Sequence, residues 1–145
     1  MKSIPHLLVV DDNPADVILV REALSGSVHR SRIHSVEDGV EAMAFLNRKE
    51  KHEHAIRPDL VILDLNLPKK AGLAVLAAMK AGPDLRRIPV VIFSTSRLSE
   101  DIQRSYELGG NCYVTKPGNL DEFFTAMKKI EDFWFGTASL PRQGE

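Results

Sequence analysis

The chain has 145 residues, with 19 Lys and Arg against 20 Asp and Glu and a net charge of −1. This length predicts one domain with a buried core, and the balanced charge gives no support for nucleic acid or an anionic membrane as a partner. The lone cysteine, Cys112, excludes an internal disulfide and is expected to be a small core residue. No apolar run approaches the ~20 residues of a membrane span and no signal peptide is evident, so we expect a cytoplasmic protein.

Strand-like and helix-like segments alternate from the N-terminus onward, a pattern typical of a doubly wound α/β fold. The apolar run 6–10 is predicted to be a strand, and Asn13 as a cap, followed by Pro14, predicts a helix over about 14–25. A second strand near 31–36 precedes a helix that Asp38 is expected to cap. The charged segment 48–58 has no periodicity and is predicted to be a surface loop.

The second half of the chain continues the alternation. Residues 59–63 form the third predicted strand, and the helix after them ends at a Gly-Pro pair. A fourth strand begins at Pro89, Ser99 is expected to cap the fourth helix, and residues 111–115 form the fifth strand. The last helix carries a predicted inward stripe: Leu120, Phe123, Met127, Ile130 and Trp134. Residues 136–145 are expected to form a frayed tail.

Polar side chains stand at or just past the C-terminal ends of four of these strands. They are Asp11, Asp12, Asp64, Ser94, Thr95 and Lys116. In an open parallel sheet these ends meet at one edge, where such folds place their chemistry. Three carboxylates, two neighbouring hydroxyls and an ammonium predict a site for a divalent cation and a phosphoryl group. Each group alone also has an ordinary structural role, such as a turn before Pro14 or a snorkelling lysine.

Asp64 is the strongest candidate among them because it ends the most apolar strand, where a lone carboxylate is costly to desolvate. A carboxylate beside a metal ion can attack phosphorus and form an aspartyl-phosphate. Phosphoryl transfer needs mainly alignment and charge neutralisation, which Lys116 and Mg²⁺ would supply. Ser94 or Thr95 could donate a hydroxyl hydrogen bond to a phosphoryl oxygen.

Over residues 4–134 the chain resembles the receiver domain of two-component response regulators. The resemblance rests on elements that follow the order and intervals of that family: Asp11-Asp12, Asp64 in DLNLP, Ser94, Tyr113 and Lys116-Pro117. It implies a flavodoxin-like (βα)5 fold with strand order 2-1-3-4-5, a C-terminal segment 135–145 and no output domain. A narrower resemblance is to the single-domain response regulators of cyanobacterial phytochromes and bacteriophytochromes. It rests on the DDNPAD start, the charged, basic loop 48–58 and the IEDFW ending.

The resemblance also implies roles for individual residues. Asp64 would be the phosphoacceptor, and Mg²⁺, with Mn²⁺ as an acceptable substitute, would be held by Asp12, Asp64 and the backbone carbonyl of Asn66. Asp11 would act mainly through water, and the Lys116-Pro117 bond would be cis. Ser94, rather than Thr95, would take the switch position, and Tyr113 would rotate in response. The protein would assist its own phosphorylation and dephosphorylation without being an enzyme for another substrate.

The partners follow from the same reasoning. No relay through histidine is supported, since His6, His29 and His34 are scattered and His52 and His54 are expected to be solvated. The phosphodonor is therefore expected to be a separate histidine kinase, of bacteriophytochrome type. The resemblance implies a homodimer through the fourth helix, fifth strand and fifth helix with the C-terminal segment. Surplus aromatic residues near that end form either an interface or a cover on their own domain: Phe124, Phe133 and Phe135.

Two other classes of protein use similar elements. A haloacid-dehalogenase-like phosphatase needs a second Asp two residues after its nucleophile, and that position here is Asn66. A flavodoxin-like cofactor binder needs a glycine- and hydroxyl-rich loop after the first strand, where Asp11, Asp12 and Asn13 would repel a phosphate. A receiver that folds but is never phosphorylated is a third alternative, which the intact acidic set argues against.

Overall fold

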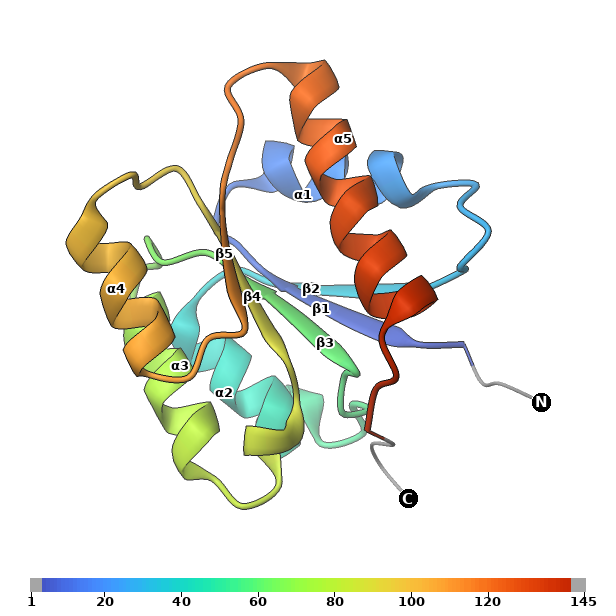
Figure 1. Ribbon diagram of the computed structural model, residues 1–145. Helices are drawn as coiled ribbons and strands as arrows, with labels where there is room; N and C mark the ends of the chain where they lie inside the picture. The colour runs from blue at the N-terminus through green and yellow to red at the C-terminus, as the bar shows by residue number, and fades with distance from the viewer. Residues whose placement is uncertain (1–3, 142–145) are drawn as a thin grey trace.

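A five-stranded parallel sheet forms the centre of the structure, a computed structural model that describes residues 4–141. The strands are β1 (His6–Val10), β2 (Arg32–Val36), β3 (Leu60–Leu63), β4 (Val90–Ser94) and β5 (Cys112–Thr115). They lie in the order β2-β1-β3-β4-β5 (Figure 1). The predicted fold class and strand order are therefore confirmed.

The central strands are apolar throughout because both faces of a parallel sheet are covered. Every residue of β3 and β4 is buried, whereas β5, at one edge, is only half-buried. Along β1 the side chains alternate between the two faces. Leu7 and Val9 pack into one core cluster and Leu8 and Val10 into the other.

Five helices cover the two faces of the sheet. They are α1 (Pro14–Leu24), α2 (Gly39–Asn47), α3 (Gly72–Ala81), α4 (Ser99–Glu107) and α5 (Leu120–Glu131). Helices α1 and α5 lie on one face, and α2, α3 and α4 lie on the other (Figure 1). Both faces are thus closed, and the loops at the C-terminal edge of the sheet are left to carry the site. Cys112 is half-buried and packs against the core on the α1–α5 face, as expected of a small core residue.

Two of the three predicted helix caps are correct. The Asn13 side chain accepts a hydrogen bond from the backbone N–H of Ala15, and Asp38 accepts one from Glu41. Ser99 is not a cap, because α4 already begins at this residue and Leu98 precedes it without a capping side chain. The chain turns earlier, at Ser96, whose hydroxyl accepts a hydrogen bond from the N–H of Leu98.

The structure contains three short elements that the sequence pattern did not predict. The segment 48–58 includes a 3₁₀ turn, η1 (Glu50–His52), and a second such turn, η2 (Leu85–Arg87), precedes β4. After α5 the chain continues as a π-helix, η3 (Asp132–Thr137). The predicted tail therefore starts two residues too early, and residues 142–145 of it lie outside the described part of the chain.

The apolar stripe of α5 is only partly as predicted. Phe123, Met127 and Ile130 are buried and Trp134 is half-buried. Leu120 is 53% exposed, because it is the first residue of α5 and lies at the helix end rather than over the sheet. Among the surplus aromatic residues, Phe124 and Phe135 pack against the domain's own core and Phe133 remains exposed.

The expected cis bond between Lys116 and Pro117 is wrong for this structure, in which residues 4–141 contain no cis peptide bond. The trans form is also the intrinsically favoured one for a bond before proline. Within the same residues, no helix is both long enough and apolar enough to cross a membrane.

Candidate functional site

The ends of β1 and β3 bring the acidic residues together. Val10 is paired with Leu63 in the parallel register, so Asp11 and Asp64 leave adjacent strands at the same level. The backbone N–H of Asp64 donates to the carbonyl of Val10 at 3.0 Å. One carboxylate oxygen each from Asp11, Asp12 and Asp64 lies within 4.8 Å of the others. The predicted acidic cluster therefore forms, with Asp11 and Asp64 buried and Asp12 exposed.

Lys116 reaches this cluster from the end of β5. Its backbone N–H donates to the Ser94 carbonyl at 2.8 Å, which fixes the start of the side chain beside β4. The ammonium Nζ donates to carboxylate oxygens of Asp11 at 2.7 Å, Asp16 at 2.8 Å and Asp64 at 2.9 Å. Only 6% of Lys116 is exposed. The lysine thus joins strands β1, β3 and β5 with helix α1 at one point.

Asp16 is a site residue that the sequence reasoning missed. It lies in the first turn of α1, four positions after Asp12, and its carboxylate is half-buried against Lys116. The available signal was weak: a helix that starts beside an acidic pair turns its first-turn side chains back toward that pair. An acidic residue there is also commonly attributed to the helix dipole.

Burial and ion pairing shift the pKa values of the central groups. Burial raises the pKa of the Asp11 carboxyl above its ordinary value, against the lowering effect of hydrogen bonds from Lys116 and Asn13. Burial alone would lower the pKa of Lys116, but its hydrogen bonds to Asp11 and Asp16 outweigh burial and raise it. The Lys116 ammonium therefore stays protonated at neutral pH, facing the carboxyl groups of Asp11, Asp16 and Asp64.

The donor atoms fit a hard divalent cation. Asp12 is exposed and makes no side-chain hydrogen bond to other residues of the described range 4–141. Asp64 accepts from Lys116 on one oxygen and from the N–H of Asn66 on the other at 3.2 Å. Carboxylate, carbonyl and water oxygens are the ligands that Mg²⁺ prefers, and one or two protein carboxylates are usually enough.

The two hydroxyl candidates lie in different surroundings. Ser94 is completely buried at the end of β4, and its Oγ accepts a hydrogen bond from the N–H of Ser96 at 3.3 Å. Thr95 is exposed. Ser94 is therefore the hydroxyl that is built into the strand end, and Thr95 faces solvent.

Tyr113 is tied to the loop after β4. Its hydroxyl donates to the backbone carbonyl of Ser96 at 2.8 Å, and its ring packs against the core on the α2–α4 face. Its backbone N–H donates to the hydroxyl of Tyr106 on α4 at 3.1 Å. Ser96 also donates its backbone N–H to Ser94 Oγ, so Tyr113 and Ser94 share a hydrogen-bond partner in the loop after β4.

A glycine holds the Asp64 turn close to α3. A Cβ atom on Gly72 would lie 2.3 Å from the Asp64 carbonyl oxygen and 2.6 Å from the Leu65 Cα. The Gly72 N–H donates to the Leu65 carbonyl at 3.0 Å. Only a residue without a side chain permits this approach, and no sequence motif marked the position in advance.

The histidines are arranged differently from the prediction. His52 is not solvated, since η1 folds back on α2 and places the ring 5.2 Å from Phe45, with Nε2 3.3 Å from Glu41 Oε1. His54 is exposed, as predicted. His6 and His34 stack on neighbouring strands, with ring nitrogens 2.9 Å apart. These pairs lie away from Asp64, and no local sequence signal indicates them.

A parallel sheet in this strand order, with an acidic cluster and a lysine at its C-terminal edge, is the arrangement of a receiver domain. Comparison with known families gives the same class of protein. The response regulator receiver domain matches residues 7–128, so the chain belongs to that family. The chain is 47% identical over 135 residues to the response regulator Rcp1 of Synechocystis sp., a match that covers 93% of this chain and 92% of Rcp1.

Solved structures give the same result. The phosphorylated cyanobacterial phytochrome response regulator RcpA is 48% identical, with a TM-score of 0.94 over 97% of this chain and 100% of RcpA. A Mn²⁺-bound form of Rcp1 is 46% identical, with a TM-score of 0.92 over 95% and 99%. The bacteriophytochrome response regulator AtBRR is 38% identical, with a TM-score of 0.75 over 97% and 100%. The predicted resemblance to phytochrome response regulators is confirmed.

Proposed function

We propose that this protein accepts a phosphoryl group on Asp64 from a phytochrome-type histidine kinase and signals through its α4–β5–α5 surface. The observation that carries the proposal is the gathering of Asp11, Asp12 and Lys116 around the Asp64 carboxylate. The similarity to RcpA and Rcp1 supports the choice of kinase. The single cysteine is in keeping with a cytoplasmic location, which is part of the proposal.

The chemistry assigned to the residues is a direct transfer. A carboxylate oxygen of Asp64 attacks phosphorus, the P–N bond to the kinase histidine breaks, and an acyl phosphate remains on Asp64. Lys116 stays protonated because its pKa is raised, and its ammonium balances charge on a phosphoryl oxygen. Later attack by water on phosphorus restores the carboxylate and releases phosphate. The protein assists both steps on its own carboxylate.

The residues fit a divalent cation in this scheme. Mg²⁺, or Mn²⁺ in its place, would be held by Asp12, Asp64 and the Asn66 carbonyl, with Asp11 acting through water. Its contribution would be to neutralise charge on the phosphoryl oxygens. Exposed Asp12 and the surplus of carboxylates over ammonium groups support this assignment.

The switch follows from the connection between Ser94 and Tyr113. A phosphoryl oxygen on Asp64 would accept a hydrogen bond from the Ser94 hydroxyl and draw the β4 end inward. Ser96 would move with it, and the Tyr113 hydroxyl would lose its carbonyl partner. The equilibrium would then shift toward a second arrangement of the α4–β5–α5 surface.

That surface is also the proposed dimer interface, together with the C-terminal segment. Exposed apolar side chains are present on it and next to it, at Leu98 before α4, Tyr106 on α4 and Phe133 in η3. Such side chains favour association between two copies over exposure to water. Sedimentation of the protein with and without phosphorylation measures this association, and a monomer under both conditions would contradict it.

The phosphoacceptor is tested by incubation with acetyl phosphate and Mg²⁺, followed by intact mass measurement. We expect the wild-type chain to gain one phosphoryl group and Asp64→Asn to gain none. Asp121→Asn, an exposed carboxylate on α5, is the matched control and should behave as wild type. An unchanged wild-type mass at saturating donor, or equal uptake by Asp64→Asn, would overturn the proposal.

The kinase assignment needs its own measurement. An autophosphorylated phytochrome-type kinase should transfer its phosphoryl group to this protein faster than to an unrelated receiver domain. Equal rates would leave the phosphoacceptor assignment intact but contradict the choice of kinase.

A further inference from the structure

Three potential metal ligands meet on the α1–α5 side of the molecule, where the loop after α1 touches the end of α5. His29 comes from that loop, Glu131 is the last residue of α5 and Asp132 is the first of η3. His29 Nε2 lies 2.8 Å from Asp132 Oδ1. One ligand atom from each of the three residues lies within 4.8 Å of the others.

Glu131 provides an independent sign that a cation belongs here. The residue is only 3% exposed. Its Oε1 accepts a hydrogen bond from the Ser27 hydroxyl, whereas Oε2 is buried and has no hydrogen-bond partner among residues 4–141. A buried carboxylate oxygen without a partner is costly, and nearly all such atoms in proteins are satisfied by a donor, a water molecule or an ion.

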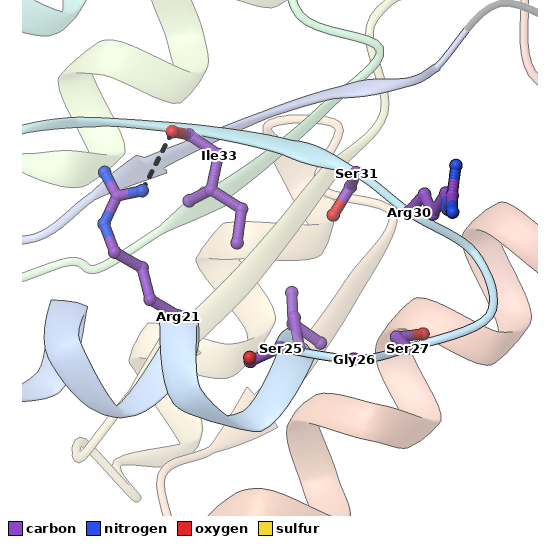
Figure 2. Close-up of a pocket in the computed structure, with 8 residues that line it drawn as sticks. Arg21, Ser25, Gly26, Ser27, Arg30, Ser31 and Ile33 are labelled. Carbon is purple, nitrogen blue, oxygen red and sulfur yellow. Dashed lines mark hydrogen bonds between the residues drawn. The ribbon is translucent and has the colours of Figure 1, made fainter.

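Neighbouring residues hold Glu131 and His29 in place. Ser27 lies on the wall of a pocket formed by the end of α1 and the following loop (Figure 2). The N–H of His29 donates back to the Ser27 hydroxyl oxygen at 3.3 Å. On the other side, a Cβ atom on Gly136 would lie 2.7 Å from His29 Cε1, so the ring rests directly against the glycine of η3.

The donor set differs from that of the phosphoacceptor site. One imidazole nitrogen with two carboxylate oxygens suits a divalent transition metal such as Zn²⁺, whereas Mg²⁺ prefers oxygen alone. A tetrahedral Zn²⁺ with ligands at ~2.0–2.2 Å places those ligand atoms roughly 3.4 Å apart and leaves a fourth position for water. His29 Nε2 and Asp132 Oδ1 are already 2.8 Å apart, and all three ligand atoms lie within 4.8 Å of one another.

We propose that His29, Glu131 and Asp132 form a second metal site, for a divalent transition-metal ion of the Zn²⁺ type. The bound ion links the loop after α1 to the start of η3. It thereby fastens the segment that carries Phe133 to the body of the domain. The site is separate from the acidic edge of the sheet and does not depend on phosphorylation of Asp64.

The test is a titration of the full chain with ZnCl₂ in excess Mg²⁺, which occupies the acidic site at Asp64. We expect one Zn²⁺ per chain by calorimetry, a rise in the unfolding temperature on addition of Zn²⁺, and a visible absorption band typical of tetrahedral coordination when Co²⁺ replaces it. Asp132→Asn should weaken Zn²⁺ binding by at least ~10-fold and remove the rise in unfolding temperature. This variant should fold, since the Asp132 side chain is 69% exposed.

Three further variants distinguish binding at this site from binding elsewhere on the chain. His54→Ala removes an exposed histidine outside the cluster and should bind Zn²⁺ as wild type does. Asp64→Asn disables the acidic site and should also leave this binding unchanged. Gly136→Ala keeps all three ligands but displaces the imidazole, so it should weaken binding. No Zn²⁺ uptake in excess Mg²⁺, or uptake that Asp64→Asn abolishes and Asp132→Asn does not affect, would overturn the proposal.

Discussion

Replacement of Lys116 by methionine removes the central cation of the site. Methionine keeps much of the apolar stem but removes the ammonium that donates to Asp11, Asp16 and Asp64 at 2.7, 2.8 and 2.9 Å. Asp11 and Asp64 are only 5% and 8% exposed. The variant therefore leaves two buried carboxylates without their cationic partner.

The expected loss is large for one side chain. Removing one partner of a buried ion pair usually costs about 3–5 kcal/mol because the remaining charge is uncompensated. That is a substantial part of the ~5–15 kcal/mol by which a domain is stable. For a chain of this size we expect the unfolding temperature to fall by roughly 10 °C.

The assay is urea unfolding at neutral pH in the presence of EDTA, so that no divalent cation replaces the ammonium. Lys129→Met, an exposed lysine on α5, is the control and should change stability by less than ~0.5 kcal/mol. Adding Asp11→Asn to the Lys116→Met variant should recover part of the lost stability, because a neutral amide then replaces one of the two unpaired carboxylates. A loss below ~1 kcal/mol, or no recovery in the double variant, would refute the reasoning.

Other predictions concern three separate positions. Gly72→Ala places a Cβ 2.3 Å from the Asp64 carbonyl oxygen, so it should destabilise the fold by more than ~2 kcal/mol and slow phosphorylation from acetyl phosphate. Burial lowers the pKa of His34 from its ordinary 6.5, with His6 contributing. The unfolded chain therefore takes up the proton first, and the free energy of unfolding should fall as the pH drops below about 6.5, less steeply in His34→Phe. Tyr113→Phe loses the hydroxyl donor to a backbone carbonyl and should cost about 1 kcal/mol in urea unfolding.

Each of these has a contrary outcome. Gly118→Ala has nothing within 4 Å of its new Cβ, and a loss equal to that of Gly72→Ala would show that close contact is not the cause. An unfolding free energy that rises on acidification through the same range, or one with identical pH dependence in His34→Phe, would contradict the histidine argument. A Tyr113→Phe variant as stable as wild type would mean that its hydrogen bond contributes nothing net.

The sequence predicted the acidic site well because strand ends can be read locally. Apolar runs that stop at Asp11, Asp64 and Ser94 identify both the strands and the side chains at their ends. Parallel pairing then brings those ends together without further information. The position of Lys116 after the fifth strand followed from the same reasoning. Its contacts with Asp11 and Asp64 agree with that prediction.

The features that were missed depend on contacts between segments. The orientation of Asp16 depends on how α1 packs against the sheet, and His52 is half-buried only because η1 returns to α2. His29 and Asp132 are in contact although 103 positions separate them in the sequence, so no local pattern predicts the pair. The isomer before Pro117 rests on a difference of only about 0.5–1 kcal/mol, too small for sequence reasoning to decide.

The central claim is that Asp64 itself carries the phosphoryl group, and chemical trapping tests it most directly. The protein is phosphorylated with acetyl phosphate and Mg²⁺, reduced with borohydride, which converts an aspartyl-phosphate to homoserine, and digested for peptide mass sequencing. We predict homoserine at position 64 and at no other aspartate. Homoserine at Asp11, Asp12 or Asp16, with residue 64 unmodified in protein that carries a phosphoryl group, would contradict the account.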